Sequence, residues 1–133
     1  RAIALLKPSV PVIGVVAALS IPLYKKAILA AENMSIYSVT KLIVQEQASF
    51  FTNNSRYARL DELNERNRDT LGIMDGSTLL IRGKFHFTMN PVSPTDSDLR
   101  ENFNITATRM YEVSQAPYVI TVDASGQIEQ ILP

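Results

Sequence analysis

The chain has 133 residues with 13 Lys or Arg, 13 Asp or Glu, and neither Cys nor Trp. This length suits one domain with a modest hydrophobic core. The lack of cysteine excludes a disulfide-stapled scaffold, a thiolate metal site and a cysteine nucleophile, and the single His86 excludes a metal site of several histidines. Because a nucleic-acid binder usually carries a basic face, the balanced charge predicts no nucleic-acid binding.

Charge is distributed unevenly along the chain. Residues 1–31 contain four basic residues and no acidic one, whereas residues 91–133 contain two Arg and six acidic residues. A basic, apolar N-terminal part and an acidic C-terminal part are typical of a chain with one end near a membrane and the other in solvent.

Residues 2–23 are almost entirely apolar or small, and Lys7 is their one charged residue. As a helix this stretch would reach roughly 33 Å, enough to cross the hydrocarbon core of a bilayer. Three interpretations compete: a cleavable signal peptide, a permanent single-pass anchor, and a segment that leaves the bilayer and packs against copies of itself. The residues around Pro22 make a poor signal cleavage site, and a lone helix in lipid has no partner for backbone groups freed by proline.

Proline and glycine predict a break in this helix. Pro8, Pro11 and Pro22 each remove a helical hydrogen bond, and Gly14 lowers helix propensity. We therefore expect the N-terminal helix to be interrupted between residues 8 and 22.

Residues 24–51 contain no Pro or Gly and predict a helix, which turn-forming residues end at 52–55. A helix of about fifty residues is far longer than the globular mean of about 12, so the remaining domain cannot cover its first half. The predicted apolar stripe consists of Leu29, Ile36, Val39, Ile43 and Phe50, broadened by Met34, Tyr37 and Leu42.

The rest of the chain predicts a polar loop and then a sheet. Residues 52–77 are expected to be a surface loop with a short helical piece at 60–64, and residues 78–132 to form antiparallel strands. In residues 84–89 the alternation places Phe85, Phe87 and Met89 on one face and His86 on the other. The predicted fold is α+β, with the long N-terminal helix packed on a small antiparallel sheet of three to four strands. Residues 1–23 form a hydrophobic assembly or transmembrane helix, and residues 24–133 a globular domain.

Residues that suggest chemistry are few. The sequence has no phosphate-binding loop or nucleophile elbow, and the alternation around His86 is more typical of an exposed strand residue than of a catalyst. Asp96, Asp98 and Glu101 are weak candidates for Ca²⁺, because they lack the spacing and the glycine of an EF-hand. We expect no metal, no cofactor and no catalysis.

The N-terminal residues resemble the type IV pilin and pseudopilin family, in particular bacterial type IVa-like pilins. Mature members of that family have an apolar N-terminal helix with Gly at position fourteen and Pro at position twenty-two, and Gly14 and Pro22 match this pattern here. Residues 48–57 and 118–128 are similar to the helix end and the last hairpin of many pilins. Family members usually begin with Phe and carry Glu at the fifth position, whereas this chain has Arg1 and Leu5.

The resemblance implies a structural subunit of a type IV pilus-like bacterial surface filament, or fimbrium, of the kind that serves adhesion or motility. It implies a helical polymer of identical chains, an assembly machinery and a prepilin peptidase as partners, and an inner-membrane location before assembly at the cell surface. Two alternatives remain, a pseudopilin of a type II secretion system and a monomeric membrane-anchored sensor or ligand-binding domain. The assembly residues would be Leu5, Val12, Gly14, Val16 and Pro22.

Overall fold

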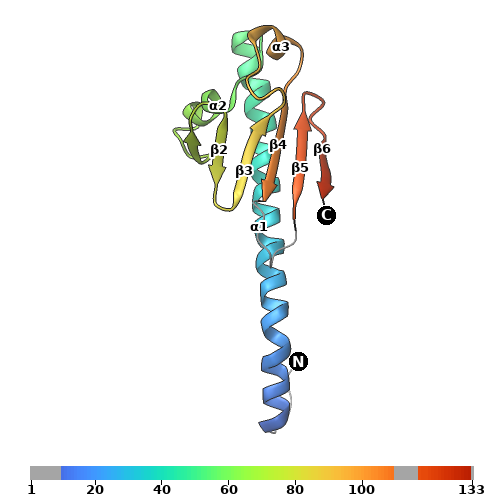
Figure 1. Ribbon diagram of the computed structural model, residues 1–133. Helices are drawn as coiled ribbons and strands as arrows, with labels where there is room; N and C mark the ends of the chain where they lie inside the picture. Colours follow the sequence, from blue (N-terminus) through green and yellow to red (C-terminus); the bar gives the residue numbers. More distant parts are fainter. Residues whose placement is uncertain (1–9, 110–116, 133) are drawn as a thin grey trace. The chain divides into compact units, whose positions relative to one another are not determined.

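A computed structural model describes residues 10–109 and 117–132 of the chain, with the side chains of the first helix described from Lys26 onward. The chain divides into two compact units, Arg1–Met34 and Ser35–Pro133, whereas the apolar pattern of the sequence predicts a boundary after residue 23. The elements are shown in Figure 1. They are α1 (Val10–Asn54), α2 (Leu60–Arg66), β1 (Ile73–Asp75), β2 (Leu79–Arg82), β3 (Phe85–Met89), α3 (Asp96–Glu101), β4 (Asn104–Arg109), β5 (Val119–Asp123) and β6 (Ile128–Leu132).

Helix α1 is continuous over 45 residues, so the expected interruption between residues 8 and 22 is wrong from Val10 onward. Pro11 lies in the first turn, where the backbone N–H has no helical acceptor to lose. Pro22 removes one hydrogen bond and Gly14 weakens propensity, and the intact turns on either side of each residue maintain the helix. Pro8 lies outside the described residues.

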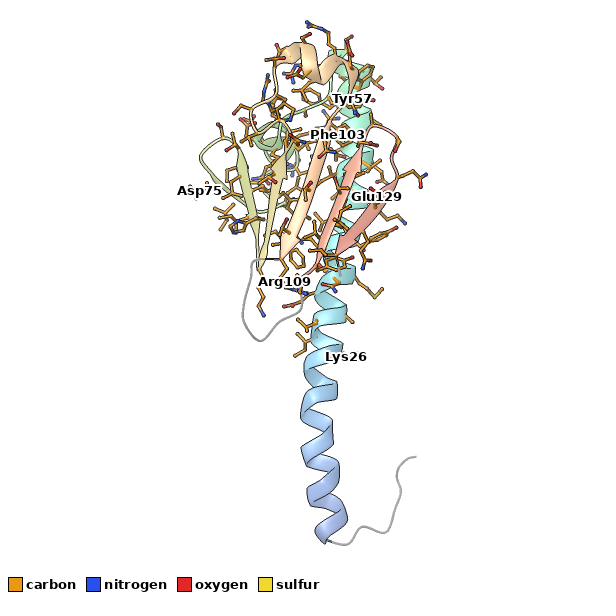
Figure 2. All side chains as sticks on the ribbon, turned by 45° about the vertical axis from the view of Figure 1, so that its right-hand side comes forward. Lys26, Tyr57, Asp75, Phe103, Arg109 and Glu129 are labelled. Carbon is orange, nitrogen blue, oxygen red and sulfur yellow. The ribbon has the colours of Figure 1, made fainter. Side chains whose placement is uncertain are left out.

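The second unit is α+β, as expected. Its sheet is entirely antiparallel with six strands in the order β1-β2-β3-β4-β5-β6, which is more than the three to four strands expected. Figure 2 labels Asp75 on β1 and Glu129 on β6, the two strands that form the edges of the sheet. The register between β5 and β6 shifts at Val119 and Ile120, which marks a bulge beside the β6 edge.

The expected loop over residues 52–77 is only partly right. It contains the last turn of α1, the predicted short helix as α2, and the unexpected strand β1. The buried Asn64 holds this segment in place, because its Nδ2 donates to the Gly72 carbonyl at 3.1 Å and its Oδ1 accepts from the Leu71 N–H at 3.0 Å. A Cβ atom at Gly72 would collide with the Ile81 carbonyl, so only glycine lets β1 begin this close to β2.

The core lies between the inner face of the sheet and one side of α1. The alternation predicted for the strands is confirmed, since Phe85, Phe87 and Met89 are buried and His86 lies on the other face. Ile105 and Ala107 of β4 are buried in the same core. Thus the two-residue period in the sequence predicted the inner face of β3.

The predicted stripe on α1 is partly confirmed. Its core-facing members in the second unit are buried, whereas the flanking row that was expected to broaden it is exposed, because a sheet covers only about one side of a helix. The buried members are Ile36, Val39, Ile43 and Phe50, and the exposed ones are Met34, Tyr37 and Leu42.

A buried amide connects α1 to the segment that follows it. The side chain of Gln47 is fully buried, and its Nε2 donates to the Ala58 carbonyl at 3.0 Å. Its Oε1 accepts from the N–H of the same residue at 2.7 Å. Gln47 therefore satisfies both backbone groups of a fully buried residue with one side chain.

We predict that Gln47→Leu destabilises the second unit by about 2–4 kcal/mol, because it leaves the N–H and C=O of Ala58 buried without partners. The measurement is urea unfolding of the detergent-solubilised chain, followed by tyrosine absorbance. The control is Gln45→Leu, at an exposed position two residues earlier, which should change stability by less than about 0.5 kcal/mol. Equal midpoints for the two variants would contradict this role.

Candidate assembly surface

The N-terminal part of α1 is apolar in sequence, and no other described element of its unit covers it. Within residues 10–34, the described part of the first unit, the structure contains a single helix. The sequence from Val10 to Leu23 has no charged residue and is apolar at most positions around the helix. One helix cannot bury its own circumference, so the described residues of this unit leave these positions without cover.

The helix places the predicted assembly positions differently around its axis. Val12 and Val16 stand one turn apart on the same side, and Gly14 stands between them on the opposite side. Pro22 lies in the interior of α1, and Leu5 lies outside the described residues. A pair of charges at Val12 and Val16 would therefore fall on one continuous strip of the helix.

Exposed apolar side chains continue along α1 from residue 26. Met34 is 73% exposed, and Ile28, Tyr37 and Leu42 are 39%, 41% and 37% exposed. The Lys41 Nζ lies 5.6 Å from the centre of the Tyr37 ring, so a cation covers part of this surface. Ala27, Ala30 and Ala31 are also exposed on this part of the helix, and such small residues let another helix approach closely.

One described helix, from Lys26 to Asn54, is long and apolar enough to span a membrane or to be a signal sequence. The same criterion also accepts the core helix of a soluble domain. Ile36, Ile43 and Phe50 of this segment are buried in the core of the second unit, which accounts for part of its apolar composition.

Two of the three weak calcium candidates, Asp96 and Asp98, already interact with other protein groups. Residues 96–101, which fall in the stretch expected to form strands, form helix α3, and the Asp98 Oδ2 accepts from the Thr95 N–H at 2.9 Å. The Thr95 Oγ1 accepts from the Asp98 N–H in return, so Asp98 is part of a capping box. Asp96 pairs with arginine, and Glu101 is exposed at the end of α3. Among the described residues, no group of three or more His, Cys, Asp or Glu is placed to hold a metal ion.

Asp96 belongs to a cluster of four alternating charges that joins α2, α3 and the end of α1. The Arg59 Nη2 lies 2.7 Å from the Asp96 carboxylate, and the Arg56 Nη2 lies 2.7 Å from that of Glu62. The Arg56 guanidinium also stacks 5.2 Å from the centre of the Phe50 ring. The hydrogen bond from Arg56 lowers the pKa of Glu62, and the one from Arg59 lowers the pKa of Asp96. Arginine therefore already neutralises the acid that a cation would need.

His86 lies on the outer face of the sheet, half-buried, opposite Ile81 on β2 and Thr108 on β4. Neither neighbour is an acid or a base, so the register gives His86 no catalytic partner on these strands. This placement agrees with the strand residue that the alternation predicts.

Comparison of the chain with models of known protein families, with curated proteins and with solved structures finds no match. The functional interpretation therefore depends on the sequence pattern and on the geometry of the described residues.

We predict that stability is nearly constant from about pH 7 to about pH 5 and falls as the pH decreases further to about 3. The pKa values of Glu62 and Asp96 are lower in the folded chain, so their stabilisation is complete above the ordinary carboxyl pKa values and is lost as pH falls through the folded ones. Glu62→Gln should lower the urea midpoint at neutral pH and make the fall toward acid pH shallower. Glu101→Gln, at an exposed position on α3, should retain the steep fall. Parallel pH profiles for the parent chain and Glu62→Gln would refute the role of Glu62.

We predict that removing calcium with a chelator leaves the melting temperature of the chain unchanged. Asp96 and Asp98 already have protein partners, and no described cluster offers the oxygens that Ca²⁺ requires. The measurement is thermal unfolding with excess EDTA and then with excess Ca²⁺. A fall of several degrees on chelation would show a native-state calcium ligand and would favour the secretion pseudopilin.

Proposed function

We propose that the chain is a structural subunit of a type IV pilus-like bacterial surface filament and polymerises with copies of itself through the N-terminal part of α1. The observation that carries this proposal is the helix from Val10 to Met34, which is apolar over most of its length and has no other described element in its unit. The second unit has a core and a sheet of its own, so it does not require this segment for its fold.

The free energy of burial favours association of this segment with copies of itself. Eight large apolar residues lie between Val10 and Leu23. Burying them at about 1.5–3 kcal/mol each would contribute roughly 12–24 kcal/mol as an upper estimate. Association costs about 4–15 kcal/mol in lost freedom of motion, so the balance favours a bundle. Head-to-tail contacts that do not close into a ring would extend such a bundle into a helical filament.

The departures from the family pattern alter the proposed docking chemistry. Leu5 replaces the Glu that pairs with a neighbouring N-terminal amine in pilins, so docking at this position is hydrophobic here. Arg1 and Lys7 then need carbonyl or acidic partners at the edge of the contact. Before assembly the same segment would lie in the inner membrane, where a prepilin peptidase and the pilus assembly machinery would act on the chain. The role is structural, with no catalysis.

We predict that the double variant Val12→Asp, Val16→Asp forms no filaments. Both positions lie on one side of α1, so the variant places two charges in a strip that the proposal buries without water. The measurement is electron microscopy and shear recovery of filaments from cells that express the variant, with immunoblotting of the membrane fraction to show that the chain is present.

The matched control adds two charges to exposed positions of the second unit, Asn53→Asp and Ser77→Asp, and should leave filaments abundant. Abundant filaments from the Val12→Asp, Val16→Asp variant would defeat the assembly proposal and favour a single-pass anchor. If neither variant nor the parent chain forms filaments while the chain accumulates in the membrane, the anchored sensor becomes the better account.

A further inference from the structure

A groove in the second unit, separate from the proposed assembly surface, has the chemistry of a cation site. It lies where the C-terminal part of α1 meets the turn after β5, and its volume is about 220 Å³. The lining residues used below are Ala48, Phe51, Tyr57, Phe103, Asp123 and Ala124. These come from segments far apart in the sequence, which the fold brings together at one place.

Three aromatic rings form a connected wall of the groove. The rings of Phe51 and Tyr57 have centres 4.7 Å apart, and those of Tyr57 and Phe103 have centres 4.9 Å apart at 60°. Figure 2 shows Tyr57 and Phe103 close together at the end of the domain where α1 finishes. Phe51 and Tyr57 are half-buried, so each combines a packed side with an accessible one. The π face of an aromatic ring carries partial negative charge, which attracts an organic cation.

A carboxylate adds a full negative charge to this wall. Asp123 ends β5 at the groove, and its Oδ1 accepts from the Ser125 N–H at 2.9 Å. Hydrogen bonds from the side chain and then the backbone of Ser125 lower the pKa of Asp123, so it is ionised at neutral pH. None of the described residues that line the groove is basic, so no side chain of the groove itself neutralises Asp123.

The turn that carries Asp123 is held in position. The Ala124 N–H donates to the Asn102 Oδ1 at 3.0 Å, and the Gly126 N–H donates to the Asp123 carbonyl at 3.0 Å. A Cβ atom on Gly126 would lie 3.6 Å from Val44 Cγ1, so this turn closely approaches α1. The carboxylate and the rings are therefore fixed relative to each other before any ligand binds.

We propose that this groove binds a small organic cation that has an ammonium group with methyl or short alkyl substituents, such as choline. The aromatic wall would contact the alkyl groups and attract the charge, while Asp123 would pair with the charge at the rim. A metal ion does not fit, because one carboxylate on an aromatic wall lacks the several oxygen ligands that such ions require. Drug-sized ligands usually occupy pockets of about 300–1,000 Å³, so the volume favours an occupant of few atoms.

The test is a titration of the full detergent-solubilised chain, labelled at alanine methyl groups, with choline chloride at constant ionic strength. The signals of Ala48 and Ala124 should shift with a dissociation constant on the order of millimolar. The neutral isostere 3,3-dimethyl-1-butanol has the same shape without the charge and should bind at least about fivefold more weakly, since it loses both charge interactions.

Two variants separate the contributions of the charge and the ring. Asp123→Asn keeps the acceptor for the Ser125 N–H and should weaken choline binding about threefold or more. Phe51→Leu removes one ring with little loss of apolar volume and should weaken it similarly. The control is Asp75→Asn, on the β1 edge of the sheet, which should bind choline as the parent chain does.

The outcomes decide the proposal even if one variant is unstable. Selective shifts at Ala48 and Ala124, with tighter binding of choline than of its isostere, support it. No shift with choline overturns it, and so does unchanged affinity in a folded Asp123→Asn. Equal binding of the neutral isostere also overturns it. That result would identify an apolar groove that does not select for charge, of the kind that an uncharged side chain of a neighbouring copy could fill.

Discussion

The second unit depends on one repeating contact, the burial of Ile36, Ile43 and Phe50 against the inner face of the sheet. These residues stand seven apart, or almost two helical turns, so they form a nearly straight line along α1. A line of this kind fixes both the rotation of the helix and its position along the strands. The polar connections then hold other elements to it, since Gln47 binds the backbone of Ala58 on the segment that leads into α2. The guanidinium of Arg56 stacks on the ring of Phe50. Arg56 in turn pairs with carboxylates on α2 and α3.

The same helix therefore has two kinds of surface along its length. Between Ser35 and Asn54 one side is buried in the core and the rest is mostly polar or small, apart from the exposed Tyr37 and Leu42. Between Val10 and Leu23 charge is absent all round, as expected for a helix surrounded by apolar material. The change occurs along a single helix in the sequence, α1.

The sequence predicts the features that depend on local periodicity. It does not predict those that depend on which strands pair or on how much of a helix the sheet covers. The two-residue period locates Phe85, Phe87 and Met89 in the core, and the helical period locates Ile36 and Ile43 there as well. Strand β1 has only three residues in a polar segment, and it exists because Ile73 pairs with Ile81, a partner that composition does not reveal. Helix α3 could have been predicted from the sequence, because Thr95 and Asp98 have the spacing of a capping box. The apolar spacing of α1 also suggested a core position for Met34, Tyr37 and Leu42, which are exposed. Such spacing shows which residues share a side of a helix, but it does not show how much of that side a sheet covers. The groove joins Phe51, Tyr57, Phe103 and Asp123 across 73 positions, so no sequence spacing predicts it.

The bulge between β5 and β6 changes what the β6 edge of the sheet offers to a further strand. Strand β6 is an open edge with exposed Ile131 and Leu132, and it contains no lysine, so by composition it would accept a strand from a neighbour. The register shift at Val119 and Ile120 increases the local twist and disturbs the row of backbone groups beside it. The backbone N–H and C=O groups of this edge would not match the hydrogen-bond spacing of a straight strand from another molecule. The edge is therefore a poor starting point for an amyloid-like ladder. In the proposed filament, where copies would be crowded, this irregular edge would oppose fusion of neighbouring sheets.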